Sequence, residues 1–503
     1  MASIKNLLDL IQSPSPEDIA IVTKAYAFAE NAHKDQKRSS GEPYFTHLFE
    51  TAETLAELGM GAITISAGLL HDSIEDVGIR PETIEKEFGP DVRFLVEGVT
   101  KLGKLQYSGA ERYTESLRKL FVAMSRDVRV LIIKLSDRLN NMQTLHLLPK
   151  EKRDRIALET LEIYAPLAYR LGIRKINREL EDLAFPLVYP KEFEKVKQLL
   201  KKKDRENIEH LEKFHKAIKR NLAHDGITNM HTSFRIKGLY SLYRKLKRKE
   251  WDIGKIYDIA ALRIIVPTVS DCYKVLGSIH GHWRPVPGRI KDYITLPKPD
   301  NYRGIHTTIF TGDGSIMEVQ IRTEEMHRKT EYGMHFEYKE STMNPRSNFA
   351  AIEWVKRFFP SFITGRKKAE GTLSGTITTN EVPSWIREFG EYNQRTAGSD
   401  EYVDDLKNDF FGDRVFVFTP KGDVIDLPAD ASPIDFAYNI HSDIGNRLAG
   451  VKVNGKLVAL DSKMENGDVI EVITKTNARP SPKWLDSAKT TIARKHIKSA
   501  LEG

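Results

Sequence analysis

The sequence contains almost no cysteine and no long apolar segment. The single cysteine among 503 residues, Cys272, cannot form an internal disulfide, and a cysteine-based zinc site is excluded. No run of about 18 apolar residues occurs, and the N-terminal segment lacks the basic and apolar regions of a signal peptide. These absences argue against a secreted or membrane-spanning protein and predict a cytoplasmic location.

The composition is otherwise that of a globular protein, with 40% hydrophobic and 29% charged residues. At roughly 150 residues per domain, the length predicts about three domains. The formal net charge of +7 is modest, but basic residues are concentrated between positions 235 and 255, where only Glu250 and Asp252 oppose them. A clustered basic surface of this kind attracts phosphate groups.

Hydrophobic periodicity divides the first two thirds of the chain into a helical part and a mixed part. Apolar residues three and four positions apart predict an all-α domain over residues 1–190, followed by a charged helical connector over 191–224. Segments 256–267 and 314–323 are rich in isoleucine and valine, as strands are. We therefore expect an α/β domain over residues 225–340.

The last third has a different pattern. Residues 341–411 show little sustained periodicity and predict a linker with short helices, the part up to residue 384 being partly flexible. Short alternating strands around a helical stretch then predict a small β-grasp-like module over residues 412–475. Residues 476–503 are predicted to begin a C-terminal helix.

Four potential metal ligands lie in the helical region: His47, His71, Asp72 and Asp137. In the string HDSIED, Glu75 and Asp76 follow His71 and Asp72 by four positions, so each pair is expected on one helix face. Two imidazoles and two carboxylates suit an ion such as Mn²⁺, which can polarise phosphate and activate water. The alternative for an adjacent His-Asp pair alone is a helix cap or a salt bridge.

A second group of polar residues lies in the α/β region. Asp258 and Glu318 lie on two predicted strands, and carboxylates on neighbouring strands can share a Mg²⁺ that bridges nucleotide phosphates. The alternative is that both are ordinary exposed strand acids. The surrounding side chains are potential phosphate donors: Arg263, Lys291, Lys298, Arg303, His306 and Arg322. Their density favours a polyphosphate substrate, and Tyr302 is either a surface for a base or packing.

The helical ligand set resembles the H…HD…D signature of HD-domain phosphohydrolases. The strings AHKDQKRSSGEPYFTH, LLHDSIEDV and KLSDRLNNM are similar to the hydrolase half of the RelA/SpoT family. This resemblance implies Mn²⁺-dependent removal of the 3′-pyrophosphate from ppGpp and pppGpp, with Glu75 and Asp76 handling the attacking water. It also implies nucleotide contacts from Arg38, Asn141 and Thr144. Ser39 and Asn140 stand where Lys and His are more usual.

The strings RIKGLYSLYRKL, YDIAALR, RIKDYITLPKP, NYRGIHTTIF and MEVQIRT resemble the synthetase domain of that family. The resemblance implies a nucleotidyltransferase-like fold and pyrophosphate transfer from ATP to the 3′-hydroxyl of GDP or GTP. Asp258 and Glu318 would hold Mg²⁺, Glu318 would help to deprotonate the acceptor, and Tyr302 would stack on guanine. The ATP phosphates would be bound by Arg235, Lys237 and Lys245.

Two further details bear on the synthetase. The string Arg289-Ile290-Lys291-Asp292 resembles the R-x-K-D form of bifunctional members. Asn301 stands where the family usually has glycine, and Gly304 replaces a polar residue, although asparagine tolerates positive φ.

Residues 412–475 resemble a TGS domain, with FVFTPKGDVIDLP as the clearest string. The resemblance implies that His441 contacts the 3′ end of tRNA, and it implies uncharged tRNA and the ribosome as partners. The alternative is a small structural module that only packs on its neighbours.

The motif order predicts a bifunctional (p)ppGpp hydrolase and synthetase, a kinase-type transferase, acting in the stringent response. Two alternatives remain open. One is a hydrolase with a weak synthetase, and the other is a tRNA- or ribosome-binding protein with relic catalytic sites. Because the two activities oppose each other, a conformational switch is expected, carried by the helical stretch 150–223.

Overall fold

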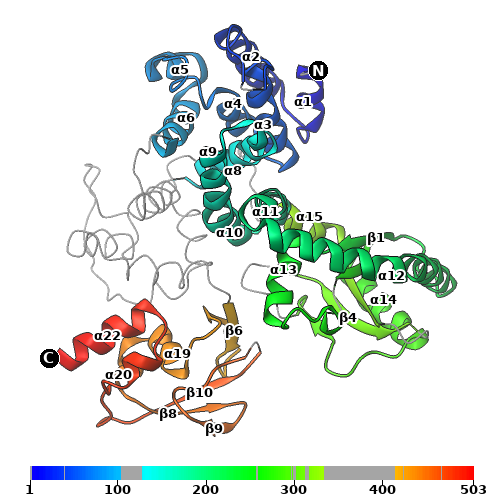
Figure 1. The fold of residues 1–503 in the computed structure, drawn as a ribbon, viewed down its shortest axis with the longest axis vertical. Coiled ribbons are helices and arrows are strands. Elements are labelled where there is room, and N and C mark those ends of the chain that lie inside the picture. Colours follow the sequence, from blue (N-terminus) through cyan, green and yellow to red (C-terminus); the bar gives the residue numbers. More distant parts are fainter. Residues whose placement is uncertain are drawn as a thin grey trace. The chain divides into compact units, whose positions relative to one another are not determined.

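Figure 1 shows the fold of the chain in a computed structural model. The structure describes ten stretches of the chain. They are residues 3–38, 40–103, 127–256, 259–295, 297, 302–311, 316–332, 414–422, 424–465 and 467–502. The predicted linker over 341–411 therefore lies outside the described residues, as do Ser39, Asp258, Lys298 and Asn301. The chain forms two compact units, Met1–Lys101 with Arg129–Asn344, and Leu102–Val128 with Pro345–Gly503.

The N-terminal part of the first unit is helical, as the periodicity predicts. Its helices are α1 (Ile4–Leu10), α2 (Pro16–Ala32), α3 (Phe45–Glu57), α4 (Ala62–Leu70), α5 (Pro81–Phe88), α6 (Pro90–Gly103), α8 (Val128–Gln143), α9 (Lys150–Glu159), α10 (Ala165–Arg170), α11 (Arg174–Val188) and α12 (Pro190–His224). A 3₁₀ turn (Leu145–Leu147) follows α8, and a π-helical turn (Thr160–Tyr164) joins α9 to α10.

Helix α4 is the centre of this helical region. Its sequence AITISAGLL is apolar on nearly every side, and the helix packs against both α2 and α3. A Cβ atom on Gly68 would lie 2.4 Å from Leu55 Cδ1 of α3. Glycine at this position therefore allows the two helices to approach closely, and these helices carry His71 and His47.

A five-stranded mixed sheet forms the rest of the first unit. Its strands are β1 (His231–Ile236), β2 (Ala260–Val266), β3 (Lys291–Asp292), β4 (Ile305–Phe310) and β5 (Ile316–Thr323), in the spatial order β1-β2-β5-β4-β3. Only β2 and β5 are parallel. The register places Glu318 opposite Ala261 and Gln320 opposite Arg263, so polar side chains line the centre of the sheet.

Three helices accompany the sheet: α13 (Leu239–Arg248), α14 (Val269–His282) and α15 (Glu324–Tyr332). Helix α14 and the C-terminal half of α12 cover an apolar core that includes Leu222, Ile264, Val275 and Ile321. Helix α11 contacts α9 and α10 of the helical region and also α13 and α15. It therefore links the metal-ligand region to the sheet.

The second unit contains a small α/β module. Its strands are β6 (Arg414–Phe418), β7 (Val424–Pro428), β8 (Leu448–Val453), β9 (Lys456–Val458) and β10 (Ile470–Thr474), and its helices are α19 (Pro433–Ile440), α20 (Ser442–Asn446), α21 (Trp484–Ser487) and α22 (Thr491–Glu502). Asn454 and Gly455 both have positive φ, which suits the tight turn between β8 and β9. Ala493 and Ile497 of α22 share the core of this module.

The predicted fold class is confirmed: a helical domain, an α/β domain and a small strand-rich module follow one another. Across the described stretches, no helix combines the length and the apolar character that a membrane span needs.

Candidate functional site

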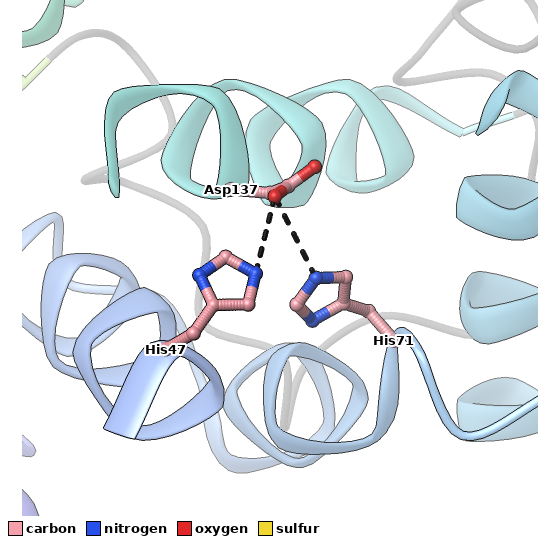
Figure 2. A group of neighbouring side chains, drawn as sticks. All are labelled: His47, His71 and Asp137. Atoms are coloured by element: carbon pink, nitrogen blue, oxygen red, sulfur yellow. Dashed lines mark ion pairs between the residues drawn. The ribbon is translucent and has the colours of Figure 1, made fainter. Parts of the chain in front are cut away.

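Three of the four predicted metal ligands, His47, His71 and Asp137, point toward one another in Figure 2. His47 lies in the first turn of α3, His71 follows the last residue of α4, Asp72 comes next in the chain, and Asp137 lies in the middle of α8. His47, His71 and Asp137 are all buried. Buried polar side chains of this kind need a partner, and here each one faces the others.

The distances place the ligand atoms around one point. His47 Nε2 lies 3.3 Å from Asp137 Oδ1 and 3.6 Å from Asp72 Oδ2, while His71 Nε2 lies 3.8 Å and 3.2 Å from the same two atoms. One ligand atom from each of His47, His71 and Asp137 lies within 4.8 Å of the other two. The arrangement therefore brings two imidazole nitrogens and two carboxylate oxygens together.

Hydrogen bonds on the outer side of each ring fix the tautomer of both histidines. Arg38 Nη1 donates to Asn140 Oδ1 at 2.9 Å, so this atom is the amide oxygen, and His47 Nδ1, 2.5 Å away, must donate to it as well. His71 Nδ1 donates to the carbonyl oxygen of Gly68 at 2.8 Å. Both Nε2 atoms therefore face the carboxylates, and each ring, when neutral, presents its lone pair there.

This donor set fits a divalent cation. Among the described residues, His71 Nε2 is buried and has no hydrogen-bond partner, so its lone pair is available as a ligand. Ligating histidines normally donate their other ring nitrogen to a carbonyl or a similar acceptor, as both rings do here. Mixed imidazole and carboxylate ligands suit first-row divalent metals.

Charge is concentrated at the same point. Burial alone lowers the pKa of His71, but Asp72 and Asp137 outweigh it and raise the pKa to about 10. Burial opposes the charge of Asp137 too, yet Lys134 and the two histidines hold its pKa well below the usual value. Lys134 Nζ lies 2.6 Å from Asp137 Oδ2. The carboxylates therefore stay ionised and favour a positive charge beside them.

The sequence reasoning assigned no role to Asn140, Tyr44 or Lys134, although all three contact predicted ligands. Asn140 donates to Glu50 while it accepts from His47 and Arg38. Tyr44 Oη donates to Asp72 Oδ2 at 2.8 Å. The i to i+3 spacing of Lys134 and Asp137 on a helix could have revealed that pair, whereas the other contacts join residues that are far apart in the sequence.

Glu75 and Asp76 are exposed and lie in a run of turns. The prediction that HDSIED forms a helix with two paired faces is wrong, because α4 ends at Leu70. Ser73 N–H donates to Leu70 O, three positions back, and Ile79 N–H donates to Ser73 O, so the helical ladder is broken. The Asp76 N–H to Asp72 O bond, at 2.9 Å, retains helical spacing.

The predicted nucleotide contacts of the helical region lie beside the ligand cluster. Arg38 Nη2 donates to Asn141 Oδ1 at 2.8 Å, and Asn141 Nδ2 donates to Asp137 Oδ1 at 2.5 Å. Thr144 follows α8 and directly precedes the 3₁₀ turn. Arg38 and Asn141 are therefore hydrogen-bonded to each other, and Asn141 is also hydrogen-bonded to the predicted metal ligand Asp137.

In the sheet, Glu318 is the end of a hydrogen-bonded chain. His306 Nδ1 lies 3.0 Å from Glu318 Oε1, and Tyr302 Oη lies 2.5 Å from His306 Nε2. Gln320 Nε2 also donates to Glu318 Oε1 at 2.9 Å. Glu318 is therefore held by neighbours on its own strand and on β4, while its predicted partner Asp258 lies outside the described residues.

Three arginine side chains lie close to this series of hydrogen-bonded residues. Arg235 and Arg322 both donate to Gln320 Oε1, at 3.4 Å and 3.3 Å, and Arg263 lies 3.2 Å from Glu331. Burial and the neighbouring Arg322 lower the pKa of Arg263 to about 10. Among the described residues, Arg322 Nε, Arg322 Nη1 and Arg263 Nε are buried without a hydrogen-bond partner. Donors in this state fit an anionic ligand such as phosphate.

The other predicted contacts of the α/β domain differ in exposure. Lys291 and Arg303 are exposed, and Lys237 and Lys245 are half-buried, the latter on α13. Tyr302 is 8% exposed, and its ring meets that of Tyr293 edge-on. Asp292 accepts from Tyr273 and Thr295 and so stabilises the turn that follows Lys291.

The backbone conformation explains why position 304 is a glycine. Its φ is 150°, and a Cβ there would lie 3.2 Å from the backbone oxygen of Ile321. Glycine therefore allows this strand entry between Tyr302 and His306.

In the small module, His441 is partly exposed between α19 and α20. Its Nδ1 accepts from the Asp443 N–H at 3.1 Å, so the ring caps α20. Within the described residues, the imidazole of His441 therefore acts as the N-terminal cap of α20.

Three known families match the chain in succession. They are the HD domain over residues 25–174, the region found in RelA / SpoT proteins over residues 234–343, and the TGS domain over residues 415–474.

Curated relatives match almost the entire chain. Guanosine-3′,5′-bis(diphosphate) 3′-pyrophosphohydrolase of Aquifex aeolicus (strain VF5) is 42% identical, over 99% of this chain and 67% of that protein. GTP pyrophosphokinase of Myxococcus xanthus is 43% identical, over 97% and 61%. Bifunctional (p)ppGpp synthase/hydrolase SpoT of Escherichia coli (strain K12) is 39% identical, over 100% and 68%. The chain thus spans about two thirds of the length of these relatives.

Among solved structures, that of a metazoan ortholog of SpoT that hydrolyses ppGpp is 24% identical. It covers 34% of this chain and 88% of that chain with a TM-score of 0.25, which is too low to bear on function. The curated relatives are decisive, because the chain covers 68% of the Escherichia coli protein at 39% identity. With the three domains in succession, the chain belongs to the RelA/SpoT family.

Proposed function

We propose that the chain is a bifunctional enzyme that hydrolyses (p)ppGpp to GDP or GTP and pyrophosphate, and that also transfers pyrophosphate from ATP to the 3′-hydroxyl of GDP or GTP. The observation that carries the first activity is the convergence of His47, His71 and Asp137 within 4.8 Å. Both Nδ1 atoms are bonded to other acceptors while both Nε2 atoms face Asp72 and Asp137, and this arrangement supports a metal site there.

In the hydrolase, His47, His71, Asp72 and Asp137 would hold Mn²⁺. The ion supplies positive charge that polarises a phosphoryl oxygen and acidifies water. Asn140 and the Gly68 carbonyl orient both imidazoles, and Lys134 balances part of the charge of Asp137. The hydrolase residues can therefore stay fixed while the substrate enters.

Two exposed carboxylates and three polar side chains complete the proposed hydrolase site. Glu75 and Asp76 are exposed and follow Asp72 closely in the chain, and their proposed role is to orient a water and accept its proton. Arg38, Asn141 and Thr144 lie along α8 and the neighbouring loop, where they can contact the nucleotide. Two of them already bond each other, so nucleotide binding and ligand geometry are connected.

In the synthetase, Glu318 and Asp258 would hold Mg²⁺, which would supply positive charge to the phosphates of the nucleotide. Glu318 would also accept the proton of the 3′-hydroxyl, and its contacts with His306 and Gln320 keep its carboxylate oriented. The phosphates would be bound by Arg235, Lys237, Lys245, Arg263, Lys291, Lys298 and His306. The buried guanidinium donors beside Gln320 support an anionic ligand.

Tyr302 would contact guanine through its aromatic ring, because its hydroxyl is already hydrogen-bonded to His306. A hydrolase with a weak synthetase is the second candidate, because Asn301 and Gly304 flank this tyrosine and depart from the family pattern. The fit of Gly304 to its backbone angle favours an intact strand entry.

The TGS module is proposed to contact uncharged tRNA and the ribosome through His441. Its ring is partly exposed, so its outer edge can meet a phosphate or an unpaired base. Binding of deacylated tRNA to the full chain and to His441→Ala, compared by filter retention, tests this part alone.

The central test uses two incubations of the purified chain. One contains ATP, GDP and Mg²⁺, and the other contains ppGpp and Mn²⁺, with the nucleotides identified by chromatography. Formation of ppGpp in the first and of GDP in the second is expected. No turnover in either would favour a binding protein with relic sites, and hydrolysis alone would favour the second candidate.

A further inference from the structure

A buried histidine without a role in the sites above lies at the end of α2. His33 is 1% exposed, and its N–H bonds Ala29 O as the helix ends. The charges that face its ring are those of Asp72, Asp76 and His71, all from the segment that follows α4. His33 is therefore next to the metal site, although it belongs to another helix.

The first link runs through the face of the ring. His33 stacks on Tyr44, with centroids 5.3 Å apart and planes 12° apart, and Tyr44 Oη donates to Asp72 Oδ2 at 2.8 Å. Burial, with Asp72 nearby, raises the pKa of Tyr44, so its hydroxyl keeps the proton. Sliding of the Tyr44 ring would break its bond to Asp72, and the stacked imidazole limits that movement.

The second link runs through the edge of the ring. Gln36 Nε2 donates to the carbonyl oxygen of Asp76 at 3.2 Å, so Gln36 Oε1 is the atom that faces His33. His33 Nδ1, 2.7 Å from it, must therefore donate. Burial lowers the pKa of His33, which agrees with a neutral ring protonated on Nδ1. This chain of bonds ends on the exposed turn that carries Asp76.

We propose that His33 is a positioning residue of the hydrolase: its face holds Tyr44 on the metal ligand Asp72, and its Nδ1, through Gln36, holds the turn that presents Asp76 to the reacting water. The inference rests on the proposed hydrolase function. The two links differ in what they hold: the Tyr44 hydroxyl bonds the proposed metal ligand Asp72 and also interacts with the Asp76 carboxylate, whereas Gln36 holds only the backbone carbonyl of Asp76. Loss of either link therefore has a different effect.

Two substitutions separate the links. His33→Phe keeps a ring on Tyr44 and removes the Nδ1 donor, and no described residue is bonded to Nε2. His33→Asn keeps a donor at the position of Nδ1 and removes the ring. Tyr44→Phe keeps the ring and removes the hydroxyl, which bonds Asp72 and also interacts with Asp76, so its Mn²⁺ affinity is the readout that reports on the first link. His215→Phe is the matched control, since His215 bonds Thr232 of β1 in the α/β domain.

Two readouts are needed, Mn²⁺ affinity by titration calorimetry and kcat with KM for ppGpp hydrolysis. Partners of metal ligands typically contribute about 10- to 100-fold. His33→Phe should lower kcat about tenfold with Mn²⁺ affinity within threefold of wild type. His33→Asn and Tyr44→Phe should weaken Mn²⁺ binding about tenfold. The control should change neither, and synthesis by each variant reports whether the chain is folded.

The outcomes are distinct. Wild-type kcat in His33→Phe, or wild-type Mn²⁺ affinity in both His33→Asn and Tyr44→Phe, overturns the proposal. Equal loss of both readouts in His33→Phe also overturns it, since the links would then not be separate. If the wild-type chain binds Mn²⁺ but does not hydrolyse ppGpp, the proposed function fails, while the affinity measurements still decide whether His33 holds Asp72.

Discussion

His47 Nδ1 and Asn140 Oδ1 lie 2.5 Å apart, and this contact sets which nitrogen of His47 faces the carboxylates. Asn140 lies on α8 and His47 on α3, so the contact also ties two ligand-bearing helices together. Asn140 in turn donates to Glu50, one helical turn beyond His47. The residue that departs from the usual family pattern is thus integrated into the metal site.

Asn140→Ala should weaken Mn²⁺ binding about 10- to 100-fold, since His47 would lose the partner that fixes its tautomer and Arg38 would lose its acceptor. Titration calorimetry measures the affinity directly. Gln143→Ala is the control, because Gln143 is exposed and lies three positions further along the same helix. Equal affinities of Asn140→Ala and the wild type would mean that Asn140 does not orient His47.

His71→Ala and Asp137→Ala should each abolish hydrolysis of ppGpp in Mn²⁺. Removal of one ligand takes away both the Lewis acid and the activation of water. Release of pyrophosphate is the measurement, and synthesis from ATP and GDP by the same variants is the control for folding. A wild-type rate in either variant would mean that the site is misassigned.

Residue type is enough to single out His47, His71 and Asp137, which the structure brings together, because the chemistry of a metal ligand is carried by residue type. Histidines and carboxylates after an apolar helix can be recognised without knowing the contacts. The contacts of Asn140 and Tyr44 could not be predicted in this way, since they join residues 28 or more positions apart. Which side chains orient a ligand depends on how helices pack, and a single sequence does not contain that information.

Periodicity also predicts the fold class, because apolar residues at helical or strand spacing must face a core. It fails for HDSIED, where i and i+4 spacing suggests a helix but α4 ends at Leu70. The backbone there turns so that Ile79 N–H can bond Ser73 O. Local spacing could not reveal this, because the bond pattern of a turn depends on its surroundings.

Glu318→Ala and Asp258→Ala should each abolish synthesis and leave hydrolysis largely intact, because these carboxylates and the metal ligands lie in different domains. Glu318 holds His306 and Gln320, so its loss also frees two polar neighbours. Nucleotide formation with Mg²⁺ and pyrophosphate release with Mn²⁺ are the two assays. Equal loss of both activities, with an unchanged circular dichroism spectrum, would contradict two separate sites.

Asp435→Ala should destabilise the C-terminal module. Asp435 is fully buried, and its carboxylate accepts from Ser432 of the α19 cap and from the N–H groups of Lys489 and Thr490 before α22. A buried donor left without a hydrogen-bond partner costs about 1–3 kcal/mol, so we expect the free energy of unfolding of the module to fall by about 3 kcal/mol.

Hydrogen exchange of α22 in the full chain measures that loss, since Ala493 and Ile497 join the core of the module. Asp443→Ala, at an exposed position on α20, is the control. Unchanged protection of α22 in Asp435→Ala would show that the carboxylate does not hold this helix.

The final prediction concerns communication between the two sites. Glu331 of α15 is shared, because Arg178 of α11 bonds one of its oxygens and Arg263 of β2 lies 3.2 Å from the other. Arg263 is a proposed phosphate contact. Nucleotide at the synthetase site should therefore change the ion pair between Glu331 and Arg178 of α11. Helix α11 lies within the stretch 150–223, which the sequence analysis predicts to carry the switch.

ATP with GDP should lower hydrolase turnover, and Arg178→Met should weaken that inhibition several-fold while both basal activities persist. Reciprocity requires that ppGpp at the hydrolase site weakens GDP binding by the same factor, which calorimetry can measure. Arg174→Met is the control, since Arg174 lies one turn earlier on α11 over the ring of Tyr169. A chain that ends at Glu340 should retain the inhibition. Its loss in that chain, or unchanged inhibition in Arg178→Met, would place the switch elsewhere.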